Sequence, residues 1–512
     1  MVQDNNSGGA TAVEPLKIQD IKVIDNAKLK KAITAAALGN AMEWFDFGVY
    51  GFVAYALGQV FFPNAAPGIQ TIAALATFSV PFLVRPLGGL FFGVMGDRFG
   101  RQKVLSLTII IMAASTFCIG LIPSYATIGI WAPILLLACK LIQGFSVGGE
   151  YTGAAIFVAE YAPDRRRGFL GSWLDFGSIA GFVMGAGLVV FLSTMMGEAA
   201  FLDWGWRIPF YLAAPLGLIG LYLRHAAEET PAFTQQLERM EKEDQDAIKD
   251  RPMVSFTEIV RNYWKSLSVC IGMVLVTNIT YYMLLTYMPT YLSQSLGYSE
   301  DHGVLIIIVV MIGMLFVQPV VGFLSDRFGR RPFLLVGSLG LLFLSLPAFH
   351  LVTSNNTPKI FAGLLMLAVF LNCLTGVMAS TLPALFPARI RYSALASAFN
   401  ISIIIAGLTP TVAAWLVETT DSLYVPAYYL MAASIIGLIT AFFLSETANK
   451  PLRGDTPSAS NKSEAKILLK EAYANIEERV DDIDEKIASL ESDIEALKLR
   501  RQTLVDRHPK LT

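Results

Sequence analysis

The stretch Gly93–Arg101, GVMGDRFGR, decides the fold because it recurs almost unchanged as Gly322–Arg330, GFLSDRFGR. Each copy follows a long apolar run, and the second copy begins 229 residues after the first. Both match the pattern Gly-x-x-x-Asp-Arg-x-Gly-Arg, which two unrelated basic loops would not be expected to share. A long-range repeat of this kind is typical of a membrane protein built from two parallel halves.

The composition around the two copies is that of an integral membrane protein. Of the 512 residues, 54% are hydrophobic and only 16% are charged, whereas a soluble domain usually carries about 25% charged residues. The net charge of −2 and the lack of a basic tail argue against a nucleic-acid partner. We expect no metal, because no Cys-x-x-Cys or histidine cluster occurs, and we expect the four cysteines to be free, buried thiols.

Twelve apolar runs are long enough to cross a membrane, which takes about 20 residues each. They cover residues 32–61, 69–95, 104–123, 130–159, 168–196, 206–224, 266–295, 303–324, 332–352, 359–385, 393–418 and 425–445. The loops after even-numbered runs are rich in arginine, and the opposite loops contain almost no Lys or Arg. This asymmetry predicts a multi-pass protein of the inner (plasma) membrane with both termini in the cytoplasm.

These runs divide the chain into six predicted parts. They are a cytoplasmic tail (1–31), a six-helix bundle (32–224), a charged cytoplasmic loop (225–265), a second six-helix bundle (266–445), a linker (446–465) and a coiled coil (466–508).

The repeated stretch resembles the signature of the major facilitator superfamily, over about residues 32–445. Three further stretches resemble its metabolite:proton symporter branch: NAMEWFDF at 40–47, RPLGG at 85–89 and QGFSVGGEY at 143–151. With its tail, the whole chain is similar to the osmosensory proline and glycine betaine transporters of that branch. The resemblance implies an all-α fold of twelve transmembrane helices in two halves. It also implies alternating access driven by the proton gradient, without a cofactor.

In that superfamily the repeated motif forms a cytoplasmic gate. The candidate gate residues are Asp97, Arg98, Arg101, Glu160, Arg167, Asp326, Arg327 and Arg330. Glu160 precedes Arg167 by seven residues, but in the second half Ala384 precedes Arg391 by the same interval. The second half therefore lacks one acid, and we expect its part of the gate to be weaker.

Ionisable residues inside the predicted spans are concentrated in the first half. Each would cost roughly 2.5–3.5 kcal/mol at the centre of the bilayer, so such residues are candidates for function. A carboxylate whose proton affinity changes as a cation approaches or withdraws could carry the transported proton. The candidates for proton coupling are Glu43, Asp46, Glu150 and Asp175.

A zwitterionic solute needs a cation for its carboxylate and, for a quaternary ammonium group, aromatic faces. The candidate substrate-binding residues are Arg85, Lys140, Trp44, Phe47, Tyr50, Tyr151, Trp173, Asn278, Tyr281 and Tyr282. These residues fit a dicarboxylate nearly as well, so the choice of proline and glycine betaine rests on the resemblance. No nucleophile elbow, P-loop or metal-binding spacing indicates an enzyme.

The tail carries apolar residues at alternating intervals of four and three, which predicts a coiled coil. The predicted core is Ile476, Val480, Ile483, Ile487, Leu490, Ile494, Leu497, Arg501 and Leu504. Arg501 at a core position disfavours a parallel pair, whereas several charge pairs favour one, so the orientation stays open. We expect a homodimer through this tail, which regulates transport by osmolality. A membrane osmosensor that transports nothing is the alternative, although it would not need two gate motifs.

Overall fold

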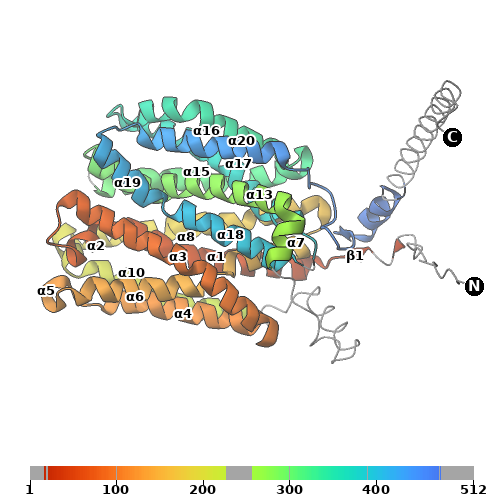
Figure 1. The fold of residues 1–512 in the computed structure, drawn as a ribbon, viewed down its shortest axis with the longest axis horizontal. Coiled ribbons are helices and arrows are strands. Elements are labelled where there is room, and N and C mark those ends of the chain that lie inside the picture. The colour runs from red at the N-terminus through yellow and green to blue at the C-terminus, as the bar shows by residue number, and fades with distance from the viewer. Residues whose placement is uncertain are drawn as a thin grey trace, which may run out of the picture. The chain divides into compact units, whose positions relative to one another are not determined.

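The computed structural model describes residues 17–18, 21–99, 101–225, 256–298, 300–388, 390–471 and 473. The chain divides into two compact units, one formed by Asp25–Asp455 and the other by the segments on either side of it. The first unit is a bundle whose helices lie side by side (Figure 1). It contains the two copies of the repeated motif.

The first half of the bundle begins earlier than predicted. The helix α1 starts at Asn26, because Asp25 caps it by accepting a hydrogen bond of 2.8 Å from the Ala27 N–H. The elements of this half are α1 (Asn26–Phe52), α2 (Ala54–Phe61), α3 (Pro67–Phe99), α4 (Arg101–Leu121), α5 (Tyr125–Ile128), α6 (Trp131–Ser146), α7 (Glu150–Tyr161), η2 (Asp164–Arg166), α8 (Arg167–Met196), α9 (Glu198–Asp203), η3 (Gly205–Arg207) and α10 (Ile208–His225).

The second half begins with α13, which starts ten residues before the predicted span. Its elements are α13 (Phe256–Tyr281), η4 (Tyr282–Tyr287), α14 (Met288–Thr290), η5 (Tyr291–Ser295), α15 (Glu300–Phe328), α16 (Arg331–Val352), α17 (Thr357–Thr381), η6 (Pro383–Leu385), α18 (Arg391–Gly407), α19 (Thr409–Thr420) and α20 (Val425–Phe443). The two segments η4 and η5 are π-helical. Such turns are rare and often lie at functional sites.

Nine helices of the described residues are long and apolar enough to cross a membrane. They coincide with nine of the predicted spans. The other three predicted spans fall on α1 with α2, on α4, whose apolar part is Leu107–Leu121, and on α10. Of the cysteines, which are free, Cys270 and Cys373 are buried as expected, but Cys139 is half-buried and Cys118 is exposed.

The two halves meet along several pairs of helices. The helices α8 and α15 pack together on one side of the bundle, and α3 packs on α18. Glycines permit the close approach of α8 to α15: a methyl group at Gly168 would overlap Ser325, and one at Gly322 would overlap Ser172. Small residues at such crossings are the usual means by which membrane helices approach closely.

The second unit pairs a segment that precedes the bundle in the sequence with one that follows it. The strand β1 (Lys22–Val23) pairs in parallel with β2 (Ser458–Ala459), with Lys22 opposite Ser458. Ile21 packs in a small apolar cluster with residues from the segment after β2. Residues 462–471 are helical. The predicted coiled-coil core, Ile476–Leu504, and most of the predicted central loop lie outside the described residues.

Candidate functional site

A buried aromatic cluster lies where α1, α3, α8, α13 and η4 meet. The Trp44 ring centroid lies 5.0 Å from that of Tyr281, 5.6 Å from that of Phe182 and 5.7 Å from that of Phe47. Tyr282 joins these rings, with its centroid 6.3 Å from that of Trp44. The structure thus brings together four residues that the sequence had marked as substrate-binding candidates.

Three members of this cluster were missed in the sequence. Phe182 comes from α8, and Phe78 and Phe82 come from α3. The Phe82 ring stacks on Phe47 at 5.6 Å and lies 5.3 Å from the ring of Tyr282. Phe78, Phe82 and Arg85 are spaced by four and three residues, so they share one helix face, and this signal could have revealed two of the three.

An ion pair lies beside the cluster. Arg85 Nη2 donates to Glu43 Oε1 at 2.8 Å, and the two side chains are 3% and 0% exposed. Among the groups that the structure describes, Arg85 Nε and the hydroxyls of Tyr281 and Tyr282 are buried without a hydrogen-bond partner. These three groups are therefore available to hydrogen-bond a polar ligand.

A second polar chain in the same half connects Lys140 to Asp46. Lys140 Nζ donates to Gln143 Oε1 at 2.8 Å, and Gln143 Nε2 donates to Thr116 Oγ1 at 3.0 Å. The Thr116 hydroxyl donates to Asp46 Oδ2 at 2.8 Å. Lys140 Nζ also lies 3.9 Å from the centre of the Tyr50 ring. We call this chain the Lys140–Asp46 relay.

The other acidic candidates lie in different surroundings. Glu150 lines a small pocket with Asp46, between α1, α4, α7 and α10. Asp175 accepts a hydrogen bond of 3.0 Å from the Tyr151 hydroxyl, and the Tyr151 ring stacks on Phe399 of the second half at 4.9 Å. Asp175 and Tyr151 are therefore tied to the interface between the halves.

Two further substrate-binding candidates are not brought to the cluster. Trp173 is half-buried and packs on Phe169 and Phe176 of its own helix. The side-chain amide of Asn278 donates to the Val274 carbonyl one turn earlier in α13, at 3.0 Å, so it serves its own helix.

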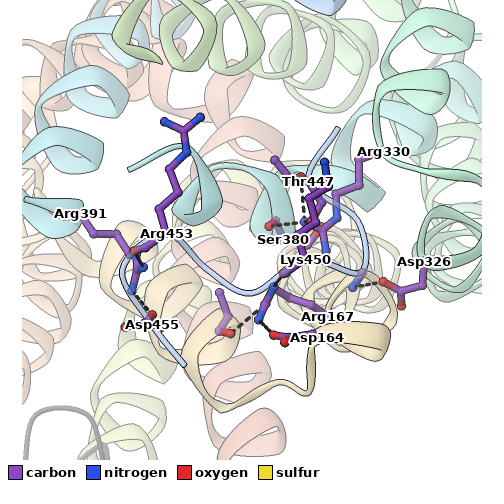
Figure 2. Close-up of polar contacts among 12 residues, drawn as sticks. Asp164, Arg167, Asp326, Arg330, Ser380, Arg391, Thr447, Lys450, Arg453 and Asp455 are labelled. Atoms are coloured by element: carbon purple, nitrogen blue, oxygen red, sulfur yellow. Dashed lines mark hydrogen bonds and ion pairs between the residues drawn. The ribbon is translucent and has the colours of Figure 1, made fainter. Parts of the chain in front are cut away.

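At one end of the bundle, charged residues of the repeated motif join the two halves. Asp326, at the end of α15, accepts the N–H groups of Gly168 at 2.6 Å and Phe169 at 2.8 Å. It thereby accepts hydrogen bonds from N–H groups in the first turn of α8, in the opposite half, that have no partner within the helix. Its negative charge also interacts favourably with the positive end of the helix dipole there. We call Glu160, Asp164, Arg167, Asp326, Arg330 and Arg391 the gate; Figure 2 shows most of them.

Arg391 forms another polar contact between the halves. Its Nη1 lies 2.9 Å from Glu160 Oε1, on the first half. The same atom lies 2.8 Å from Oδ2 of Asp455, the last residue of the unit (Figure 2). Ala384 leaves the second half without an acid of its own at this position, but Arg391 is paired with acids from elsewhere in the chain. Asp455 and Glu160 supply the charge that Ala384 cannot, so Glu160 pairs with Arg391, and Arg167 pairs instead with Asp164 at 2.5 Å.

Arg330 lies beneath the segment that follows α20. Its Nη1 donates to the carbonyls of Ser380 and Thr447, both at 3.1 Å, and burial lowers the pKa of Arg330 to about 10. Burial opposes ionisation of Glu446, but four backbone N–H groups, including that of Arg330, outweigh it and lower the pKa of this carboxyl. Arg327 is exposed beside Phe328. The side chains of Asp97, Arg98 and Arg101 lie outside the described residues.

Comparison with known proteins identifies two families. The family described as sugar (and other) transporter matches residues 32–455, and the osmosensory transporter coiled coil matches residues 460–512. The proline/betaine transporter of Escherichia coli (strain K12) is 68% identical over 98% of each chain. The glycine betaine/proline/ectoine/pipecolic acid transporter OusA of Dickeya dadantii is 69% identical, also over 98% of each chain.

Solved structures of the same fold include that of XylE, a proton:xylose symporter of the major facilitator superfamily. It superposes with a TM-score of 0.67 at 19% identity, covering 86% of this chain and 99% of that one, a likeness that concerns the fold alone. The chain is a multi-pass membrane transporter rather than an enzyme. It belongs to the sugar (and other) transporter family within the major facilitator fold, and its C-terminal segment belongs to the osmosensory transporter coiled-coil family.

Proposed function

We propose that the protein is a proton-coupled symporter that imports zwitterionic compatible solutes, such as proline and glycine betaine, and is activated by high osmolality. Support comes from the names of relatives that match it over 98% of its length, including the tail. It would lie in the inner membrane with both termini and the gate facing the cytoplasm, as the arginine-rich loops indicate.

The observation that carries this proposal is the buried Arg85–Glu43 pair beside the aromatic cluster. Arg85 Nε is a buried donor without a partner among the described groups, so it can take the solute carboxylate. The faces of Trp44 and Tyr281 can hold the positively charged ammonium group, which cannot donate a hydrogen bond when it is quaternary. Glu43 adds a negative charge on the same side.

The same geometry disfavours the dicarboxylate alternative. Two carboxylates need two cations that are available for binding. Arg85 can take one carboxylate through Nε, but the Glu43 carboxylate beside it repels a second, and Lys140 is engaged with Gln143 and the Tyr50 ring. One carboxylate and one cation therefore match this site better than two carboxylates do.

We assign proton transfer to Asp46. It is buried and joined to Lys140 by two intervening side chains, so movement of this lysine changes the charge that Asp46 experiences. Glu43 is held by Arg85, and Asp175 is held by Tyr151, which leaves each less free to change its partner. The proton site and the solute site are then separate but lie on the same helix, α1.

The coiled coil would form a homodimer in the cytoplasm and set the osmolality at which transport begins. Its family match supports a coiled coil in this segment. A dimer would bury the apolar seam that the heptad pattern predicts. Transport of a solute through one bundle does not need a coiled coil, so we assign this segment a regulatory role.

Competition in proteoliposomes tests the solute assignment. Uptake of labelled glycine betaine should be inhibited by unlabelled proline and left unchanged by succinate at the same concentration. Inhibition by succinate without inhibition by proline would support the dicarboxylate reading instead.

A further inference from the structure

The segment Glu446–Asp455, which follows α20, lies along the gate, and we call it the strap. The Glu446 carboxylate accepts the N–H groups of Arg330 at 3.0 Å and Arg331 at 3.1 Å. Asn449 adopts a left-handed backbone conformation with a φ of 57°. Its side-chain amide donates to the Asp326 carbonyl at 3.0 Å. The start of the strap is therefore fixed to the second half of the bundle.

The middle of the strap reaches the first half. Arg167 Nη1, on α8, donates to the Lys450 carbonyl at 2.9 Å, and the Arg167 side chain is only 2% exposed. Leu452 is buried in a cluster with Ala159 of α7 and Ala384 of η6. The strap thus contacts both halves, as Figure 2 shows for Lys450 and Arg167.

The end of the strap returns to the second half, at Arg391. Asp455 pairs with Arg391 Nη1, and the Arg453 carbonyl accepts from Arg391 Nη2 at 2.9 Å. The Ala388 N–H also donates to the Arg453 carbonyl, at 3.1 Å. Because the same Nη1 also binds Glu160 of the first half, the strap orients the arginine that joins the halves.

The chain leaves this unit at Asp455, and β2 begins three residues later at Ser458. A rearrangement that travels along the chain from the tail through β2 therefore reaches the bundle at Asp455. Peeling the strap from this end would first release Arg391 and Ala388, and Arg391 would lose two of the groups that hold it towards Glu160.

We propose that the strap is an autoinhibitory element, whose end at Asp455 must leave Arg391 and Ala388 before the gate can open. The tail controls transport by controlling this release. The inference rests on the proposed activation by osmolality, and it adds the contact through which that activation acts.

Weakening the end of the strap tests the first step. Asp455→Asn removes the charge beside Arg391 and should raise uptake at low osmolality by about tenfold, within the range of coupling between linked sites. It should also lower the osmolality of half-maximal activity. Asp203→Asn, at an exposed position of α9, is the matched control and should leave the curve unchanged. An Asp455→Asn curve that coincides with the parent's would overturn the proposal.

Locking the end of the strap tests the second step. A Cβ atom at Gly454 would lie 3.8 Å from the Ala388 Cβ, the usual separation in a disulfide. In a background without the four native cysteines, oxidised Ala388→Cys/Gly454→Cys should lose uptake at high osmolality, and a reductant should restore it. The single Gly454→Cys variant controls for strain at this glycine, whose φ is 82°.

The two possible failures are distinguishable. If the parent's uptake does not depend on osmolality, the proposed activation fails. If the parent responds and the fully cross-linked protein transports as fast as its reduced form, the strap does not move during transport and the inference is overturned.

Discussion

Replacing Asp326 with alanine removes both hydrogen bonds by which the second half caps α8 of the first. The two bonds, of 2.6 and 2.8 Å, join a carboxylate to backbone N–H groups across the gate. A hydrogen bond to a charged group contributes about 1.5–3 kcal/mol. The contributions of two hydrogen bonds to one carboxylate are not additive. We therefore take about 3 kcal/mol as the stabilisation that the closed gate loses when both bonds are removed.

The bonds join the halves to each other, so their loss favours the open gate. A change of about 3 kcal/mol corresponds to a factor of more than a hundred in the equilibrium between two states. Asp326→Asn keeps one acceptor oxygen and should give an intermediate shift. The fold within each half should be retained, since both bonds run between the halves.

The reactivity of a cysteine beneath the gate reports this equilibrium. Ser380 is buried on α17 opposite Gly171 of α8, so Ser380→Cys, in a background without native cysteines, is shielded while the gate is closed. A membrane-impermeant maleimide added on the gate side should react about a hundredfold faster in the Asp326→Ala protein. Arg327→Ala, at the exposed neighbouring position, is the control. Equal rates in Asp326→Ala, Arg327→Ala and the parent would refute the role of Asp326.

The remaining predictions concern the Arg85–Glu43 ion pair, proton transfer at Asp46, the pH dependence of stability at Glu446 and the coiled-coil tail. Glu43→Gln should lower thermal stability, because breaking a buried pair costs about 3–5 kcal/mol; Glu43→Leu/Arg85→Met should recover the melting temperature but not betaine binding, and recovery of both would contradict the site. Asp46→Asn should keep betaine exchange but lose gradient-driven accumulation, which a pair of isotope-flux assays separates. In the folded protein the pKa of Glu446 is lowered from its usual value of 4.5. The ionised carboxylate therefore contributes to the free energy of unfolding above pH 4.5, and this contribution disappears as the pH falls through the folded-state pKa. The difference in melting temperature between the parent and Glu446→Gln should therefore be constant near neutrality and shrink below that pH. Ile487→Pro should shift the osmotic threshold of uptake and spare the maximal rate, whereas an unchanged threshold would remove the tail from regulation.

The repeated motif and its candidate gate residues could be recognised in the sequence because the motif recurs with fixed internal spacing. The residues that pair with its arginines could not be recognised in the sequence. Asp455 follows Arg391 by 64 residues, across three helices or parts of helices and a loop, and no local pattern connects them. We expected a weaker gate in the second half because a comparison of the two halves shows Ala384 where the first half has an acid. The acids that pair with Arg391 are Glu160, from the other half, and Asp455, from beyond the last helix.

The membership of the aromatic cluster was predicted in part, because helical spacing gives a face but does not say where that face points. Phe78 and Phe82 share the face of Arg85 and could have been found by spacing. Trp173 lies two residues before Asp175, hence on a different side of α8, and only the packing of the bundle shows that the aspartate faces inward. Asn278 was singled out as a polar residue in a span, but bonding to its own helix satisfies it.

Uptake of labelled glycine betaine into proteoliposomes, with and without an inward proton gradient and at low and high external osmolality, tests the central claim most directly. We predict uptake above equilibrium only when the gradient and high osmolality are both present. Accumulation without a gradient would contradict proton coupling, and no uptake by vesicles in which exchange of another solute proves the protein active would contradict the assignment of the solute.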